Sequence, residues 1–387
     1  MTPGQARRLL SAEGRAAVAL ASGLDLTPAA RVRSAEAVRH LGPLGPLALE
    51  QAILRRRALS KHPDGDQLWW TAEALEQSTP RPVAVHRARR FTDSSQVVDV
   101  GCSVGGDLLP LAAVAPVVGV DLDEARLLLA RANAEVLGLT VSLLRADAQA
   151  LTPRGDVFAD PARRAGGRRT FDPRSYSPPL DVVLGWPARS LGVKVAPGID
   201  HEALPPELEV EVVSLGGDVK EAVLWGGAAR TGHRRTATVL RAGTSSAEAA
   251  SLVDDGAPVP GVRAPGRFLL EPDGAVIRAH LVAEVARLVD GWLLDATIAY
   301  VAADAVVATA YGTWFEVLDL LPFGLKPLRE VLRTHDAGML VVKKRGTAVE
   351  PDVLRRQLKL TGSREVTVVL TRSAGRQVAM VVRRVPL

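Results

Sequence analysis

The sequence is short of cysteine, of aromatic residues and of histidines in metal-binding patterns. A single cysteine, Cys102, among 387 residues excludes an internal disulfide and a zinc site built on cysteine ligands. The seven histidines show no H-E-x-x-H or other metal-ligand spacing, so we expect no metal. Aromatic residues make up only 4% of the chain, so any aromatic side chain near a candidate site is informative.

Long apolar runs are also missing. No stretch reaches about eighteen uninterrupted apolar residues, the length that a membrane-spanning helix requires. The first residues, MTPGQARRLLSAEG, lack the apolar core of a signal peptide. We therefore expect a cytoplasmic protein without a membrane partner. The sequence predicts no oligomeric state.

Hydrophobic content and charge are moderate. Hydrophobic residues make up 47% of the chain, which is ample for buried cores in two or three domains. The formal net charge is +5 and the isoelectric point is near 9.6. This balance fits a polyanionic partner, but an arginine-rich composition from a GC-rich genome would produce the same number. Local clusters of charge are therefore more informative than the total.

The periodicity of the chain changes near residue 97. Residues 1–92 carry apolar residues at helical spacing between proline and glycine breaks, which predicts a helical N-terminal region. Over 93–245, short β-branched runs alternate with helical ones, which predicts βαβ units around a buried parallel sheet. The stretch LDVVLGWPAR (180–189) suits either a strand or a crossover helix.

The remaining sequence predicts a linker and a smaller α+β domain. Residues 246–267 are rich in small residues, proline and glycine, and are the best linker candidate. Within 268–387 we expect helices near AVIRAHLVAEVARLV, KPLREVLRTHD and EPDVLRRQLKLTG, a strand at GMLVVKKRG, and a hairpin of EVTVVLTR with QVAMVVRR.

The stretch VVDVGCSVGGD (97–107) allows two interpretations. Its GCSVG portion matches G-x-S-x-G, the nucleophile elbow of a serine hydrolase. A strand, a glycine-rich turn and a helix can instead bring a nucleotide-like cofactor close to the backbone. The hydrolase interpretation needs a late histidine with an acidic partner, and His201 and His233 lack that context. Cys102 is most simply a small residue beneath the loop, because no basic partner is evident.

Acidic residues stand at the ends of the next three predicted strands. Asp121 lies about twenty residues beyond Gly101, where a carboxylate can accept both ribose hydroxyls of an adenine nucleoside. Asp147 ends the third strand and could accept from an adenine amino group, and Asp160-Pro161 ends the fourth. Each Asp alone would more often be a cap or a turn residue. Ligands of open α/β sheets bind outside the carboxyl ends of the strands, so the shared order favours one site.

The spacing of the first loop is D-x-G-x-x-x-G and not the G-x-G-x-x-G of NAD-binding units. With the acidic second strand and the Asp-Pro of the fourth, residues 94–241 resemble the class I S-adenosylmethionine-dependent methyltransferases. The resemblance implies a Rossmann-like, doubly wound, seven-stranded sheet that binds S-adenosylmethionine. The cofactor contacts it implies are Asp99, Gly101, Cys102, Ser103, Gly105, Gly106, Asp121, Leu122, Asp147 and Ala148.

Two further resemblances concern the substrate. Residues 68–91 followed by VGCSVGGD are similar to the start of the catalytic domain of trimethylguanosine synthase-like RNA methyltransferases, where a Thr-Pro, here Thr79-Pro80, and a helix precede a G-V-G-G loop. With the C-terminal LVVKKRGTAVEPDVLRRQLKL and REVTVVLTR, the whole chain resembles bacterial methyltransferases that end in a THUMP-like domain. That domain type is associated with RNA binding, so the resemblance implies an RNA substrate such as a tRNA or rRNA base.

The fourth strand end departs from a known pattern. Amino-group methylases use a [DNS]-P-P-[FYW] turn, in which the acidic or amide side chain and a Pro carbonyl accept from the target NH2 and the aromatic ring stacks on a flipped base. Here the turn is Asp160-Pro161-Ala162-Arg163. We expect Asp160, Pro161 and Arg163 to be catalytic, with Arg163 stacking through its guanidinium plane or with Phe171, Tyr176 or Trp186 in its place. An exocyclic amine, a ring nitrogen, a carbon and a ribose hydroxyl all stay open as acceptors.

Two basic clusters could contact an RNA backbone or could simply be solvated. Arg164 and Arg168 belong to an RRAGGRR loop beside Asp160, and Lys343, Lys344 and Arg345 lie near the C-terminus. We therefore predict an S-adenosylmethionine-dependent RNA methyltransferase. The alternatives are an inactive RNA-binding module with the same fold, which would bind the cofactor without transfer, and a small-molecule methyltransferase, which would lack salt-dependent RNA affinity.

Overall fold

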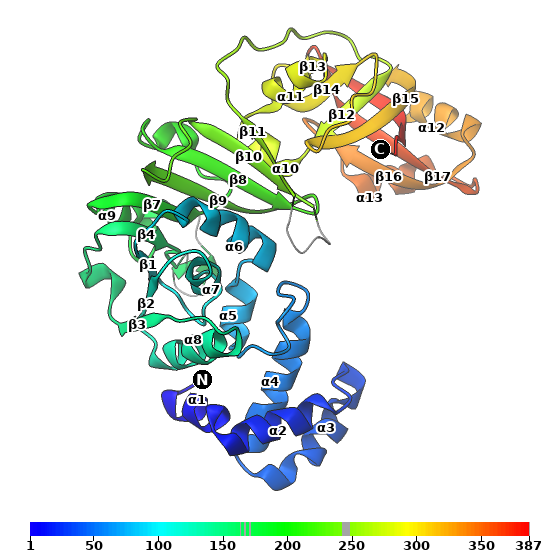
Figure 1. Cartoon of the computed structure of the whole chain (residues 1–387). Helices are drawn as coiled ribbons and strands as arrows, with labels where there is room; N and C mark the ends of the chain where they lie inside the picture. The colour runs from blue at the N-terminus through cyan, green and yellow to red at the C-terminus, as the bar shows by residue number, and fades with distance from the viewer. Residues whose placement is uncertain (163, 166–167, 170–171, 242–247, 387) are drawn as a thin grey trace. The chain divides into compact units, whose positions relative to one another are not determined.

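The chain divides into two compact units in a computed structural model that describes residues 1–162, 164–165, 168–169, 172–241 and 248–386 (Figure 1). The first unit comprises Met1–Val210 and Lys220–Gly232. The second comprises Glu211–Val219, His233–Arg241 and residues 248–386. The predicted helical region and the greater part of the predicted methyltransferase sheet therefore pack as one unit.

The first unit begins with short helices joined by proline and glycine turns, as the sequence predicts. Thr2 and Gln5 form a capping box at the start of the first helix, and Ser11 caps the second. The buried faces of these helices meet around Leu9, Val18 and other apolar residues. The helices are α1 (Pro3–Leu10), α2 (Ala12–Ser22), α3 (Arg31–Ala37), α4 (Leu44–Ala58), α5 (Ala72–Gln77) and α6 (Arg81–Ala88).

A largely parallel sheet follows and confirms the predicted α/β class. Its strands in the first unit lie in the order β9-β7-β4-β1-β2-β3, with only β9 antiparallel to its neighbour β7. β1 and β2 are almost wholly buried, which explains their continuous Val-rich sequences. The strands are β1 (Val97–Val100), β2 (Val117–Asp121), β3 (Ser142–Arg145), β4 (Gly155–Ala159), β7 (Ala188–Val195) and β9 (Asp218–Gly227). β8 (Glu209–Leu215) begins in the first unit and continues into the second.

Helices connect the parallel strands. α7 (Leu108–Ala112) follows β1, α8 (Glu124–Val136) follows β2, and α9 (Leu180–Leu184) precedes β7. The ambiguous stretch at 180–189 is therefore a crossover helix that leads into a strand. The sequence did not distinguish this helix from a strand, because a helix of five residues is too short to show periodicity.

Several strands lie where the sequence predicts none, among them β9, β11 and, in the second unit, Phe268–Pro272, Trp292–Asp295, Ile298–Ala303 and Gly312–Pro322. β9 alternates too little to stand out, because its central residues are buried on both faces. β11 (Ala249–Val253) lies within the predicted linker and pairs antiparallel with β10 (Arg235–Leu240). The small residues of β11 pair with the neighbouring strand through backbone hydrogen bonds, which do not depend on side-chain type. The composition of this segment therefore does not indicate a strand.

The second unit also contains a seven-stranded sheet in the order β13-β14-β12-β15-β18-β17-β16. Leu328 and Leu332 of α12 and Leu354 and Leu358 of α13 pack on one face of it, where the sequence predicts helices. The predicted hairpin is β17 with β18. The elements are β12 (Phe268–Pro272), α10 (Gly274–Arg278), α11 (Val282–Leu288), β13 (Trp292–Asp295), β14 (Ile298–Ala303), β15 (Gly312–Pro322), α12 (Leu325–Thr334), β16 (Ala337–Lys344), α13 (Pro351–Leu358), β17 (Arg364–Ser373) and β18 (Arg376–Arg384).

The described part of the chain contains no helix that is long and apolar enough to cross a membrane. Within the same residues, no group of three or more His, Cys, Asp or Glu side chains is arranged to hold a metal ion.

Candidate active site

The loop after β1 is a tight turn that only glycine can form at two positions. Gly101 and Gly105 have φ angles of +86° and +102°, where L side chains are strained. A Cβ atom on Gly101 would also lie 3.2 Å from the carbonyl oxygen of Asp160. The amides of Gly101 and Cys102 both donate to the carbonyl of Val120 at the end of β2. The loop therefore exposes bare backbone at the carboxyl edge of the sheet.

The carboxylate at the end of β2 holds this loop. Asp121 Oδ2 accepts from the amide of Ser103 at 2.9 Å, and its Oδ1 accepts from the amide of Asp123 at 2.9 Å. A carboxylate has about four acceptor positions, so two remain for hydroxyl groups of a ligand. The side chain of Leu122 is 61% exposed beside it, where it could pack on a flat ring.

The end of β3 carries the next acidic side chain. Asp147 is exposed and caps the turn that contains Ala148 by accepting from the amide of Gln149 at 2.9 Å. This turn is tied to the next strand end, because the Gln149 side chain donates to Ser177 Oγ at 3.2 Å and Ser177 pairs through its backbone with Ala162.

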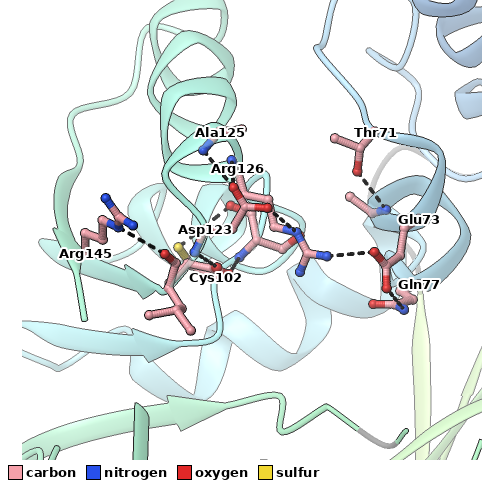
Figure 2. Close-up of polar contacts among 12 residues, drawn as sticks. Thr71, Glu73, Gln77, Cys102, Asp123, Ala125, Arg126 and Arg145 are labelled. Atoms are coloured by element: carbon pink, nitrogen blue, oxygen red, sulfur yellow. Dashed lines mark hydrogen bonds and ion pairs between the residues drawn. The ribbon is translucent and has the colours of Figure 1, made fainter. Parts of the chain in front are cut away.

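Figure 2 shows how the N-terminal helices support this edge. Arg126 of α8 donates to Glu73 of α5 at 2.9 Å and pairs with Asp123, which caps α8 through the amide of Ala125. Arg145 at the end of β3 donates to the carbonyl of Leu122 at 3.2 Å. These contacts link the loops after β2 and β3 to the helical region.

A buried amide makes the same connection from below. Asn133 of α8 is fully buried, and its Nδ2 donates to the carbonyls of Trp69 and Val104, at 3.0 and 2.8 Å. Its Oδ1 accepts from the amide of Trp69 at 2.6 Å. One side chain thus joins the helical region to the glycine loop.

Asp99 on β1 is the one polar group of this edge whose oxygens are both orphaned. The side chain is 1% exposed, and neither carboxylate oxygen has a hydrogen-bond partner among the described residues. Burial, assisted by the nearby Asp107, raises the pKa of Asp99 well above its usual value. A buried acceptor without a donor is costly, and a ligand that carries a donor or a positive charge would satisfy it.

The carboxylate after β4 is held by a buried lysine. Lys194 of β7 donates to Asp160 Oδ2 and to Thr79 Oγ1, each at 2.7 Å. The Lys194 side chain is 5% exposed, whereas Asp160 is 26% exposed and so is partly accessible. Burial alone lowers the pKa of Lys194, but the carboxylates of Asp160, Asp107 and Glu221 more than offset it, so the pKa is raised and the group stays a cation.

A second buried cation lies next to it. Arg87 of α6 forms ion pairs with Asp107, which precedes α7, and with Glu221 of β9, and it lies over the ring of Phe158. Burial lowers the pKa of Arg87, and the two carboxylates reverse that effect, so the pKa is raised. The side chain is 3% exposed, so these charges are sealed beneath the acceptor side of the edge.

Sequence reasoning missed Lys194, Arg87 and Glu221 as parts of the site. Their elements are far apart along the chain, and no motif connects them. The only available signal is a lysine inside the otherwise apolar run LGVKVAP, because lysine is rarely buried without a carboxylate partner. Thr79 was singled out by the trimethylguanosine synthase-like resemblance, and that narrower resemblance stays a prediction.

The remaining predicted residues are placed as follows. Gly106 lies beside Ser78, which precedes Thr79, and Cys102 is buried, with a pKa that burial raises well above its usual value. A thiol in that state is a packing group and not a nucleophile. Pro161 is buried after Asp160. Arg163 lies outside the described residues. Arg164 and Arg168 contribute backbone to a two-stranded ladder of Arg164–Ala165 with Arg168–Arg169.

The three C-terminal cations belong to the second unit, and each faces a carboxylate. Lys343 donates to Glu271 at 2.6 Å, and Arg345 approaches the same carboxylate at 3.6 Å. Lys344 pairs with Glu350 at 3.0 Å. The positive charge of this cluster is therefore largely balanced within the unit.

The first unit fits S-adenosylmethionine. A glycine loop offers bare backbone, Asp121 and Asp147 offer acceptors, and the orphaned Asp99 lies beneath the loop. An adenosine has ribose hydroxyls and an amino group as donors, and a sulfonium carries positive charge, so ligand and site are complementary. A site of this kind at the edge of a parallel sheet is characteristic of the class I S-adenosylmethionine-dependent methyltransferases.

Comparisons with known proteins agree. Residues 97–159 match a protein-family model described as "Methyltransferase domain", and residues 312–384 match one described as "THUMP domain-like". A Mycobacterium tuberculosis protein, recorded from two strains as an uncharacterized S-adenosylmethionine-dependent methyltransferase, is 42% identical over 346 residues, which cover 86% of this chain and 94% of the relative. The chain belongs to this family of S-adenosylmethionine-dependent methyltransferases.

A solved structure shares the fold over the full length. The crystal structure of a proposed methyltransferase from Porphyromonas gingivalis W83 covers 100% of this chain and 95% of its own, with a TM-score of 0.70 and 20% sequence identity. The succession of a helical region, a methyltransferase sheet and a C-terminal α+β region is therefore also found in this Porphyromonas gingivalis protein.

Proposed function

We propose that this methyltransferase acts on RNA, on a base of tRNA or rRNA, in the cytoplasm. The observation that carries the proposal is the THUMP domain-like match at residues 312–384 in the same chain as the methyltransferase domain. The sequence that follows Asp160 is rich in arginine, and Arg164 and Arg168 are candidates for contact with a phosphate backbone. Lys343, Lys344 and Arg345 are further candidates for RNA contact.

The cofactor side of the site is proposed from the geometry of the first unit. Asp121 would accept from the ribose hydroxyls and Asp147 from the adenine amino group, with Leu122 and Ala148 against the ring. The loop, comprising Gly101, Cys102, Ser103, Gly105 and Gly106, would approach through its backbone, and Asp99 would face the positive end of the cofactor.

Little covalent chemistry is asked of the protein. When bound, S-adenosylmethionine supplies a methyl group on a sulfonium whose positive charge disappears as the group leaves. The chain's own residues must then hold the acceptor atom in line with that methyl group and exclude water. A Cβ atom on Gly101 would lie 3.2 Å from the carbonyl oxygen of Asp160, so the glycine loop and the turn after β4 approach each other closely.

The acceptor side is built around Asp160. Lys194 holds one carboxylate oxygen, which fixes the side chain in one orientation, and the exposed part of the carboxylate can accept a hydrogen bond from the acceptor group. Pro161 limits the turn, and Arg163 would stack on the acceptor base. This role requires an acceptor with at least one N–H or O–H.

The experiment that tests the function is mass spectrometry of nucleosides from tRNA and rRNA of a deletion strain and its parent. We expect one methylated nucleoside to disappear and to return when the wild-type chain is supplied from a plasmid. The Asp160→Ala variant should not restore it. Unchanged nucleosides in every RNA class would contradict RNA methylation and would point to a small-molecule acceptor.

A further inference from the structure

Positive charge is concentrated at the start of the chain. The first 62 residues contain ten Lys and Arg residues against four Asp and Glu residues, a net charge of +6, whereas the whole chain has a net charge of +5. All other residues together therefore have a net charge of −1. The charge that suits a polyanion lies on the N-terminal helices and not on the rest of the chain.

Four arginines on α3, α4 and the turn between them present this charge to solvent. Arg31, Arg33, Arg39 and Arg56 are all exposed, and within the described part of the chain none forms an ion pair with a carboxylate. We call these four residues the α3–α4 arginine surface. Among exposed arginines elsewhere in the first unit, Arg7 and Arg145 both pair with Glu124.

The shape of this surface also suits a ligand. Arg31 and Arg39 line a shallow hollow of about 460 Å³ together with Val32, Ala35 and Glu36. Val32 of this lining is 72% exposed, so part of the hollow is apolar. Glu36 is the only acidic residue of this lining, so the hollow has two cations against one anion.

The other two arginines converge on a neighbouring point. Arg33 and Arg56 both help to lower the pKa of Asp25, after the hydrogen bonds from Thr27 that are its main cause. Two helices thus bring their guanidinium groups within electrostatic range of the same carboxylate, so two cations face one anion at this point. Guanidinium groups bind phosphate oxygens through paired N–H donors, and several in a row can follow a phosphate backbone.

The surface is joined to the active site within one unit. α4 packs against α2 in the core that also includes Trp69, and Asn133 links Trp69 to the glycine loop through Val104. A polyanion held on α3 and α4 is therefore held by the same unit that binds the cofactor, with no hinge required between them.

We propose that the α3–α4 arginine surface binds the phosphate backbone of the RNA substrate. This inference rests on the proposed function, and it assigns the main electrostatic contact to the N-terminal helices. The C-terminal cations Lys343, Lys344 and Arg345 are balanced by Glu271 and Glu350, so each would have to give up an ion pair to bind phosphate. An unpaired arginine does not carry that cost.

The test measures binding of a fluorescently labelled tRNA transcript by the full chain over a range of salt concentrations. The triple variant Arg31→Gln/Arg33→Gln/Arg39→Gln should weaken binding at least tenfold at about 50 mM salt and lower the slope of log K against log salt by about 2 to 3. Glu36→Gln should act in the opposite direction and tighten binding. All four positions are exposed, so the variants should melt at the wild-type temperature.

A matched triple variant controls for loss of charge. Arg267→Gln/Arg287→Gln/Arg383→Gln also removes three positive charges, but from arginines that pair with Glu316 or Asp255. It should leave the affinity and the salt slope nearly unchanged. Equal losses in both triples would overturn the inference, because binding would then follow total charge alone.

Two other outcomes are decisive. If the α3–α4 triple variant keeps wild-type tRNA affinity, or if the wild-type chain binds anionic phosphatidylglycerol vesicles and no tRNA, the inference is wrong. RNA methylation by such a chain would still uphold the proposed function. If instead the chain binds tRNA through these arginines but no nucleoside changes in the deletion strain, the proposed function fails and the binding surface stands.

Discussion

The cofactor side and the acceptor side of the active site are built in different ways. The cofactor side is made from strand ends that follow one another along the chain, with Asp121 and Asp147 each capping the backbone next to it. The acceptor side is assembled from distant elements. Asp160 binds Lys194, which lies 34 residues further along the chain, and Lys194 in turn binds Thr79, 115 residues before it.

The two sides also differ in their energetics. On the cofactor side Asp121 and Asp147 are at least partly exposed and bind backbone amides, so water can replace a missing ligand there at low cost, whereas Asp99 is buried. On the acceptor side Arg87, Lys194 and Glu221 are buried, and removing one member of such a group leaves its partner charged without compensation. The comparison shows that loops local in sequence are enough to build the cofactor-binding side, whereas a buried network of charged side chains sets the geometry of the acceptor side.

The largest effect is expected on the acceptor side. Asp160→Ala removes the proposed acceptor of the hydrogen bond from the substrate, so kcat for methyl transfer to RNA from the deletion strain should fall by about 10²- to 10³-fold. Calorimetry should show a cofactor Kd within a factor of about two of wild type. A comparable loss of cofactor affinity would break the division into two sides.

The converse is expected for Asp121→Ala. Loss of charge-assisted hydrogen bonds to two ribose hydroxyls should raise the cofactor Kd by about 100-fold or more. Asp123→Ala, two residues further on, is the matched control. It removes the cap of α8 and should cost about 1 kcal/mol of stability without a change in cofactor affinity. If calorimetry finds an unchanged Kd for Asp121→Ala, the cofactor assignment is wrong.

Lys194 is a positioning residue, and its replacement should have an intermediate effect. Lys194→Met leaves Asp160 without its buried partner, so kcat should fall by about tenfold while the cofactor Kd stays unchanged. Lys194→Arg should recover part of the lost kcat because it keeps the positive charge. If Lys194 only filled space, Lys194→Arg would not do better than Lys194→Met. Lys61→Met is a control for loss of a neighbouring lysine, because Lys61 donates to the backbone carbonyls of Leu75, Glu76 and Ser78.

The smallest effect concerns Asp99, which is coupled to both sides. Its pKa is raised in the folded chain, so the folded state keeps the proton while the unfolded state loses it above the usual Asp pKa of 3.8. Stability is therefore lost as pH rises above 3.8. Asp99→Asn should raise the melting temperature of the cofactor-free protein at neutral pH by about 2 to 4 °C, an advantage that shrinks below pH 4.

The same variant sharpens the comparison through the ligand. If Asp99 faces the positive end of the cofactor, Asp99→Asn should weaken cofactor binding while it stabilises the free protein. Thermal melting with and without S-adenosylmethionine measures both effects in one experiment. A variant that is neither more stable nor weaker in binding would show that Asp99 is satisfied in solution by other means.

Much of the fold could be predicted from the sequence. The Val-rich runs of β1 and β2 announce a buried parallel sheet, and the helices α12 and α13 and the hairpin of β17 with β18 follow from period and turn signals. Several strands were not predicted: β9 is buried on both faces, β11 is made of small residues, and β12, β13, β14 and β15 of the second unit were also missed.

The same contrast holds for the site. The carboxylates at the ends of β2, β3 and β4 are visible in sequence because the order of strands fixes their order along one edge. The partners of Asp160 are not visible, because Lys194 is one of many charged residues until the sheet places it beside that carboxylate. The pairing of Lys343 and Arg345 with Glu271 is hidden for the same reason.

By itself the sequence determined the family and the cofactor, because these depend on short-range spacing in the glycine loop and on residues that end consecutive strands. The tertiary structure decided which charged side chains are free to bind a ligand and which are held in ion pairs. Folding buries Arg87 and Lys194 in ion pairs, balances the C-terminal cations, and leaves Arg31, Arg33 and Arg39 exposed and unpaired. The value of a charge depends on its neighbours in space, and only the fold determines those neighbours.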